Sequence, residues 1–242
     1  AEAAHDLGIA AMTIVDSFHF AALWPEVEAL AAEGPAGVAC VNWSRVMAPH
    51  GGREAIFGTN PLAYAWPRQQ GAPVVADMAT AAMSRGDLYL AEKAGRRVPE
   101  GTGLDADGRP TTDPAQILSG TQLPFGGHKG SAIALLVELL AAAATGEAFS
   151  DETADGVAAD APVRGGEFIL ALCPHVLAGS NADSRTEAFL QRLDAIPGAR
   201  LPGARRHEMA LHMLCLLCMP TCPTYGKCTM RSERQPPSAA PR

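Results

Sequence analysis

The 242-residue sequence has few aromatic side chains, no excess of basic residues and no apolar run long enough to cross a membrane. Its formal net charge is −7, which makes nucleic acid or an anionic membrane surface an unfavourable partner. The most apolar stretch, Ser131 to Gly146, is shorter than the roughly 20 residues that span a bilayer. We therefore expect neither a nucleic-acid nor a membrane partner.

The opening of the chain leads us to expect no export signal. It opens on AEAAHDLG, without an initiator Met and without a basic segment followed by an apolar core. We therefore expect a cytoplasmic protein. The alanine-rich opening resembles the end of a helix that closes at Gly8, so we expect further sequence upstream.

The cysteines do not form the paired pattern of a structural zinc site. Cys40 and Cys173 lie alone in strand-like runs, where we expect small buried side chains. The others crowd the end of the chain and form one C-x-x-C without a second close pair: Cys215, Cys218, Cys222 and Cys228. We expect no metal site.

The composition changes from about Met209, where Met, Cys and Pro cluster without a regular period. We therefore expect residues 1–208 to form the functional domain and residues 209–242 to be a disordered tail.

The most regular helix of the sequence follows a glycine-rich turn. Ser131 is a good N-cap, Gly146 a natural stop, and the apolar residues between them run almost all the way round, which predicts a buried helix. Ahead of it, Gly126, Gly127 and Gly130 allow close approach of a ligand, and His128 and Lys129 add positive charge where a helix N-terminus already favours an anion.

This turn suits a phosphate or a carboxylate, although a plain loop with a solvated Lys129 explains it equally well. The spacing GGHKG matches neither the dinucleotide fingerprint nor the P-loop. If a nucleotide binds here, it is held in another way.

Strand-like and helical segments alternate along the rest of the chain, which indicates an α/β architecture. We expect strands within residues 11–15, 37–43, 57–67, 73–76 and 167–172, the first of them buried. We expect further helices over residues 22–32, 80–94 and 186–193. Residues 95–122 and 150–165 are rich in Gly, Pro and Asp, which predicts long surface loops.

Several motifs occur in one order along the chain: HFAALWP at 19–25, FGTNP at 57–61, DMAT at 77–80, DADGRPTTDP at 105–114, LPFGGHKG at 123–130 and LPG at 201–203. Together they resemble the malate/L-lactate dehydrogenase-like family of NAD(P)H oxidoreductases, over residues 3–208. HFAALWP and GGHKGSA are most similar to its Δ1-piperideine-2-carboxylate/Δ1-pyrroline-2-carboxylate reductases. The resemblance implies a non-Rossmann α/β fold with a mixed sheet and helices.

The resemblance also implies a site. Residues implied to line the NADPH pocket are His19, Phe20, Ala21, Ala22, Leu23, Asp77, Met78, Ala79, His128, Lys129, Arg200, Arg205 and Arg206. Either Arg205 or Arg206 could hold a 2′-phosphate. Thr59 matches a substrate-contacting threonine, and Asp87 matches the aspartate that orients a catalytic histidine.

Each of these residues also has an ordinary structural explanation. His19 could cap the helix that follows it, and Asp77 could simply end a strand. Thr59, in the Thr-Asn-Pro sequence, fits a tight turn, and Asp87 could lie in solvent near a helix N-terminus.

The implied activity is NADPH-dependent reduction of cyclic imino acids, with NADH as a possible alternative donor, in a homodimer. Two other functions stay open: a malate, lactate or ureidoglycolate dehydrogenase of the same family, and a non-catalytic fragment that retains nucleotide binding. The family's proton donor and substrate clamp lie in an upstream Ser-His-Gly-x-x-Arg motif, which this sequence does not contain. We therefore expect His19 to be the nearest acid and the isolated chain to lack full activity.

Overall fold

The computed structural model describes residues 1–17, 22–153 and 165–209. The chain divides into two units, Ala1–Gly203 and Ala204–Arg242. In the second unit residues 204–209 are helical. All elements named below belong to the first unit.

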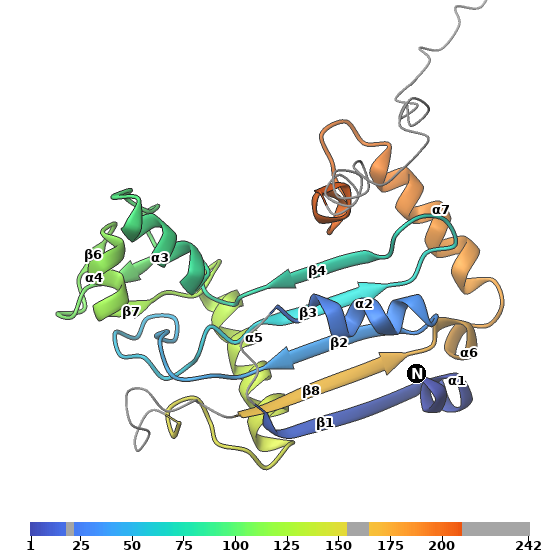
Figure 1. Ribbon diagram of the computed structural model, residues 1–242, viewed down its shortest axis with the longest axis horizontal. Helices are drawn as coiled ribbons and strands as arrows, with labels where there is room; N and C mark the ends of the chain where they lie inside the picture. The colour runs from blue at the N-terminus through green and yellow to red at the C-terminus, as the bar shows by residue number, and fades with distance from the viewer. Residues whose placement is uncertain (18–21, 154–164, 210–242) are drawn as a thin grey trace, which may run out of the picture. The chain divides into compact units, whose positions relative to one another are not determined.

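A five-stranded sheet with the order β1-β8-β2-β3-β4 forms the centre of this unit (Figure 1). Its strands are β1 (Ile9–Ser17), β2 (Ala36–Val41), β3 (Leu62–Trp66), β4 (Val74–Met78) and β8 (Gly165–Leu172). Each neighbouring pair of these strands is antiparallel. The α/β prediction is confirmed, but the described strands of the central sheet are antiparallel rather than mixed. The antiparallel pairing also distinguishes this sheet from the parallel, doubly wound sheet of a Rossmann fold.

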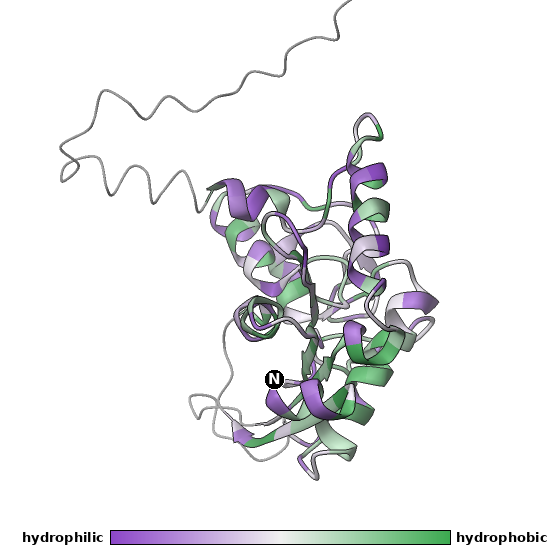
Figure 2. Ribbon diagram, turned by 90° about the vertical axis from the view of Figure 1, so that its right-hand side faces the viewer, coloured by the Kyte–Doolittle hydropathy of each residue, from purple (hydrophilic) through white to green (hydrophobic). Residues whose placement is uncertain are grey.

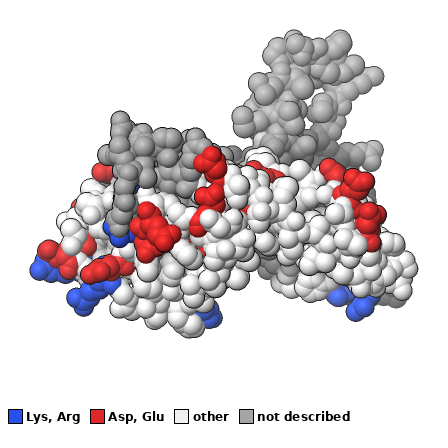
Figure 3. Space-filling view, turned by 90° about the horizontal axis from the view of Figure 1, so that it is seen from below, with Lys and Arg blue, Asp and Glu red and all other residues white. Residues whose placement is uncertain are grey.

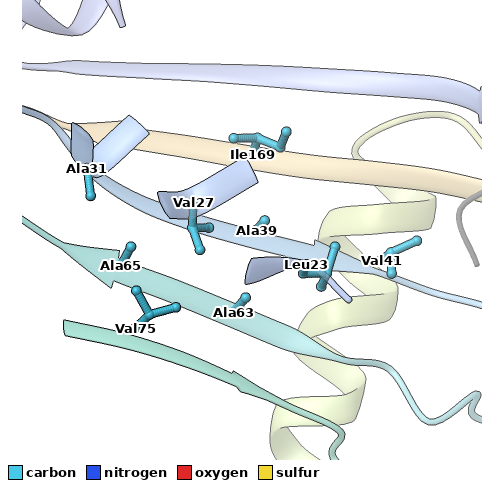
Figure 4. Close-up of a cluster of buried hydrophobic side chains, with 9 residues drawn as sticks. All are labelled: Leu23, Val27, Ala31, Ala39, Val41, Ala63, Ala65, Val75 and Ile169. Carbon is cyan, nitrogen blue, oxygen red and sulfur yellow. The ribbon is translucent and has the colours of Figure 1, made fainter. Parts of the chain in front are cut away.

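One face of the sheet is covered by α2 (Trp24–Ala32), which the sequence predicts closely. Pro25 stands in its first turn, where a missing N–H costs nothing. Nine buried apolar residues join the helix to the sheet (Figure 4): Leu23, Val27, Ala31, Ala39, Val41, Ala63, Ala65, Val75 and Ile169. Alanines on the strands allow the helix to lie close to the sheet.

The opposite face carries α5 (His128–Glu138), continued by the π-helix η1 (Leu139–Ala143), and α7 (Ala182–Asp194). Figure 2, which views the sheet edge-on, shows α2 on one side and α5 and α7 on the other. Val137 and Ala141 pack on Cys40, as expected for a small buried thiol. Leu190 of α7 packs with Val74 and Leu201.

Three sequence predictions about these elements are wrong. The helix begins at His128 rather than Ser131, because Gly127, with φ of 62°, takes the N-cap position. The helix is also not buried all round, since Leu135, Leu136 and Leu139 are 47–49% exposed. The first strand is an edge strand rather than a buried one, and Ile9, Met12 and Val15 on it are about half exposed.

Residues 95–122, predicted to be a surface loop, contain a small folded subregion. A three-stranded sheet of β5 (Gly103–Leu104), β6 (Pro110–Thr111) and β7 (Thr121–Gln122) packs against α4 (Pro114–Ser119). Leu88 and Ala91 of α3 (Arg85–Lys93) pack with Ile117 in a separate apolar cluster. The strands are two residues long, too short to give a periodic signal in the sequence.

The remaining elements lie near the chain start and before α7. The N-terminal helix α1 (Glu2–Leu7) ends at Gly8 with φ of 84°, as predicted. The short helix α6 (Pro174–Ala178) was not predicted, and α7 extends beyond the expected residues 186–193. Seen from the β1 side, the surface has broad uncharged stretches between groups of acidic and basic residues (Figure 3). Over the residues described, no helix has the length and apolar character needed to span a membrane.

Candidate functional site

The glycine turn at the start of α5 presents positive charge to solvent. Gly126 and Gly127 have φ values of 56° and 62°, a conformation that favours glycine. They direct the chain into the helix, so that His128 and Lys129 lie exposed in its first turn. Partial positive charge from the helix N-terminus adds to that of Lys129. The turn therefore favours an anion.

Gly130 serves packing rather than ligand access. A Cβ at this position would collide with the carbonyl oxygen of Phe125 and lie 3.0 Å from that of Thr80. Gly130 N donates to the Phe125 carbonyl at 3.0 Å, which closes the turn. The positive φ values of the turn thus belong to Gly126 and Gly127, whereas Gly130 is required for close packing.

His50 joins this turn, although it belongs to none of the motifs that the sequence analysis singled out. Its ring centroid lies 6.0 Å from that of His128. A Cβ on Gly127 would come within 3.1 Å of the His50 ring, and His50 N donates to Ser131 Oγ at 3.1 Å. No spacing signal links residues so far apart, so only the fold brings this second imidazole to the site.

Asp77, at the end of β4, holds the start of α2. Its Oδ2 accepts hydrogen bonds from Leu23 N at 2.8 Å and Trp24 N at 3.0 Å. A carboxylate at a helix N-terminus is stabilised by the dipole and by amides that lack partners within the helix. Asp77 is therefore more than a strand-ending residue, because it joins the HFAALWP and DMAT segments.

Thr59 and Thr80 connect the next two segments. The Thr59 carbonyl accepts from Thr80 N and Thr80 Oγ1, both at 2.8 Å. The Thr80 carbonyl in turn accepts from Phe125 N at 3.0 Å. These bonds bring the FGTNP, DMAT and GGHKG motifs to one end of the sheet.

The neighbours of Asp77 differ in exposure. Met78 is 42% exposed, whereas Ala79 packs against a small apolar cluster around Met47 and Ala134. Ala22 is exposed. Leu23 is fully buried beneath α2, so its side chain belongs to the core and its backbone amide serves Asp77.

Asp87 lies in the first turn of α3, where its contacts are local. Ser84 Oγ donates to Asp87 Oδ2 at 2.8 Å, and Asp87 N donates to Ser84 Oγ at 3.0 Å. Ser84 thus caps α3 through its hydroxyl, and the Asp87 carboxylate binds the same hydroxyl. Its carboxylate is exposed, so the capping role leaves the other oxygen accessible.

The structure gives less information about the remaining predicted site residues. His19, Phe20 and Ala21 lie outside the described part of the chain. Arg200 is exposed at the start of a segment that lies along β4, where Val75 N donates to the Pro202 carbonyl at 3.2 Å. Arg205 and Arg206 belong to the second unit.

The turn fits the phosphates of a dinucleotide, since it combines accessible glycine backbone, a cationic side chain and a helix N-terminus. A metal ion is not suggested by the described residues, in which no group of three His, Cys, Asp or Glu side chains could hold one. The charge and backbone of the turn therefore suit an anionic organic ligand.

Comparisons with known proteins show the family of the chain. A family model described as malate/L-lactate dehydrogenase matches residues 1–213. The Δ1-pyrroline-2-carboxylate/Δ1-piperideine-2-carboxylate reductase of Pseudomonas putida is 46% identical over 208 residues, covering 85% of this chain and 61% of that protein. The chain thus spans less than two thirds of that relative's length.

Two solved structures show the same fold. The Δ1-piperideine-2-carboxylate reductase of Pseudomonas syringae pv. tomato is 42% identical with a TM-score of 0.83, over 89% of this chain and 65% of its own. A putative malate/lactate dehydrogenase from E. coli is 30% identical with a TM-score of 0.74, over 84% of this chain and 59% of its own.

Proposed function

The chain belongs to the malate/L-lactate dehydrogenase family, and from this premise we propose that it serves an NADPH-dependent reduction of cyclic imino acids. The substrates would be Δ1-piperideine-2-carboxylate and Δ1-pyrroline-2-carboxylate, and the products pipecolate and proline. The motif-based resemblance to the family is confirmed by the family match.

The observation that carries the proposal is the difference in identity between two kinds of relative. Identity is 46% and 42% to proteins named as reductases of these imino acids, but 30% to a putative malate/lactate dehydrogenase. A reductase therefore ranks ahead of a 2-hydroxy-acid dehydrogenase.

The glycine turn supports a nucleotide as the cofactor. Lys129 and the amides at the start of α5 would meet its phosphates, and His50 and His128 would flank them. Arg200 would add charge, and Arg205 or Arg206 would favour NADPH over NADH through a 2′-phosphate. NADPH, when bound, supplies a hydride to the carbon of the C=N bond.

The protein would bind the imino acid and manage the proton that its nitrogen gains. Thr59 would contact the substrate, and Asp77 would set the approach to the pocket by holding the start of α2. His19 would be the nearest acid in this chain, and Asp87 would orient the histidine that donates the proton. One imine, one NADPH and one proton thereby give one amine and one NADP⁺.

Fluorescence titration with NADPH, followed by absorbance assays of NADPH oxidation, tests the proposal. We expect binding of NADPH, and oxidation, below full activity in this chain, that depends on Δ1-piperideine-2-carboxylate more than on pyruvate. A preference for pyruvate would instead identify a 2-hydroxy-acid dehydrogenase. Binding without oxidation would mean that this chain holds the nucleotide but does not complete the reaction.

A cytoplasmic homodimer remains our expectation for this protein. Sedimentation velocity at several concentrations would measure the oligomeric state, and a monomer at all of them would contradict the dimer.

A further inference from the structure

A carboxylate is buried at the far end of α5. Glu138 is 4% exposed, and its Oε1 accepts from Asn60 Nδ2 at 2.7 Å. Its Oε2 accepts from Ser150 N at 3.1 Å and from Asn42 Nδ2 at 3.3 Å. The hydrogen-bond partners described for it are thus all neutral N–H donors, and burying a charge on neutral partners is costly unless they serve it fully.

Glu138 also stands where the helix changes type. It is the last residue of α5, and the chain continues directly into the π-helix η1. Such π-turns are frequent at functional sites. A carboxylate retained here despite the cost of its burial calls for a role beyond packing.

The strongest partner of Glu138 has a strained backbone. Asn60 is fully buried with φ of 40°, a region that non-glycine residues seldom adopt. Its Nδ2 also donates to the Ala134 carbonyl at 3.0 Å, so α5 holds this side chain at two points. A Cβ on Gly58 would lie 2.7 Å from Asn60 Oδ1, which explains the glycine two residues earlier.

A continuous set of bonds runs from Asn60 to the glycine turn. Thr59, next to Asn60, accepts both hydrogen bonds of Thr80, and the Thr80 carbonyl accepts from Phe125 N. Phe125 precedes Gly126 and accepts from Gly130 in the first turn of α5. The start of α5 and its end are therefore tied to the same Thr59–Asn60 segment.

We propose that Glu138 is a positioning residue, whose buried carboxylate fixes Asn60 and thereby sets Thr59 against the glycine turn. The inference rests on the proposed function, because it assigns the substrate-contacting Thr59 and the nucleotide-binding turn to one rigid unit. Glu138 itself touches neither ligand in this scheme.

The test is Glu138→Gln in the full chain. An amide nitrogen replaces one carboxylate oxygen, so one of the surrounding N–H donors faces another donor. We expect amide hydrogen exchange at Thr80, Phe125 and Gly130 to accelerate about tenfold, and NADPH affinity to fall about tenfold. Glu187→Gln is the matched control, because it also replaces a buried carboxylate with an amide. Glu187 lies on α7 and binds Arg68.

The control separates positioning from general destabilisation. If both variants accelerate exchange at these three amides equally, Glu138 acts only on global stability and the proposal is overturned. If Glu138→Gln leaves both exchange and affinity unchanged, it is overturned as well.

Asn60→Gly provides a second test should Glu138→Gln not fold. Glycine accepts the backbone conformation but removes the side-chain link, so faster exchange at the same amides supports positioning and unchanged exchange contradicts it. The exchange readout needs no nucleotide. Failure of the unsubstituted chain to bind NADPH would therefore count against the proposed function alone.

Discussion

The two faces of the central sheet differ in the kind of residues that pack against them. Beneath α2 the described core is apolar, with Leu23 and Val27 packed on alanines of the strands. Beneath α5 an apolar patch around Cys40 adjoins a polar network centred on Glu138. The first face can stabilise the fold through burial alone, whereas the second depends on the orientation of its hydrogen bonds.

The two faces also differ in their proposed roles. An apolar core tolerates small shifts, because dispersion and burial depend weakly on direction. A hydrogen-bonded network permits only certain arrangements, so it can hold Thr59 and the glycine turn in one geometry. The α2 face is therefore expected to govern stability and the α5 face to govern ligand binding.

The largest effect is expected from Leu23→Ala. Leu23 is fully buried beneath α2, and emptying such a site costs about 3 kcal/mol of unfolding free energy. The matched control is Leu136→Ala on α5, which is 48% exposed and should cost less than about 1 kcal/mol. Urea unfolding followed by tryptophan fluorescence measures both. Equal losses would show that Leu136 is covered in solution and that the contrast between the faces is wrong.

A smaller loss is expected from Glu187→Gln, which breaks the bond between α7 and Arg68. The Arg68–Glu187 pair joins Arg68 Nη2 to Glu187 Oε1 at 2.6 Å, with side-chain exposures of 18% and 7%. Because Arg68 is partly solvated, we expect a loss of about 2 kcal/mol rather than that of a fully buried pair. Urea unfolding at neutral pH measures it, and Gln191→Ala, a weaker partner of Glu187, serves as the control.

The unfolding free energy lost in Glu187→Gln should depend on pH, because the substitution removes the Arg68–Glu187 pair. The hydrogen bond from Arg68 lowers the pKa of Glu187 below its ordinary value of 4.5. Stabilisation by this carboxylate is thus complete above that value and is lost as the pH falls through the lowered pKa. The stability difference between the unsubstituted chain and Glu187→Gln should therefore shrink in acid. A difference that stayed constant down to strongly acidic pH would contradict this assignment.

An effect on binding rather than stability is expected from Lys129→Ala. Loss of the exposed cation beside the glycine turn should weaken NADPH binding about tenfold, which is about 1.4 kcal/mol, and leave unfolding unchanged. Lys93→Ala, an exposed lysine in the last turn of α3, is the control. If both substitutions weaken NADPH binding alike, the loss comes from the overall charge of the protein and not from a contact at the glycine turn.

The smallest effect is expected at Cys40, within the apolar part of the α5 face. Burial, followed by the charge of Glu167, raises the pKa of the thiol from 9.0 to about 12. The thiolate is therefore scarce at pH 8, and alkylation of the native chain should leave Cys40 unmodified. Peptide mass spectrometry with a urea-denatured control measures this. Rapid native labelling would show that this part of the face opens to water.

Much of the fold was predictable because the relevant signals are local. Gly8 and Pro25 mark helix ends through their own backbone preferences, and the strands of the central sheet are continuous apolar runs. The α/β class and the family resemblance followed from such segments and from motifs within them. The folded subregion at 95–122 was missed because its two-residue strands have no period of their own.

Part of the site could likewise be predicted from residues that are neighbours in the sequence. His128 and Lys129 adjoin the glycines that expose them, so the sequence alone indicated an anion at this turn. The start of the helix was misplaced by three residues, from Ser131 to His128, because Gly127 caps it through backbone conformation and no side-chain signal competes with Ser131. Ser131 instead accepts a hydrogen bond from His50.

The sequence by itself determined the class of fold, the helix and strand segments, and the charged turn, because each depends on residues close together along the chain. Only the tertiary structure decided that His50 flanks that turn, that Asp77 holds α2, and that Glu138 binds Asn60. These contacts join segments far apart in sequence, and their geometry depends on how the antiparallel sheet sets the strand ends side by side. Chain periodicity carries no record of such contacts, so the fold had to supply them.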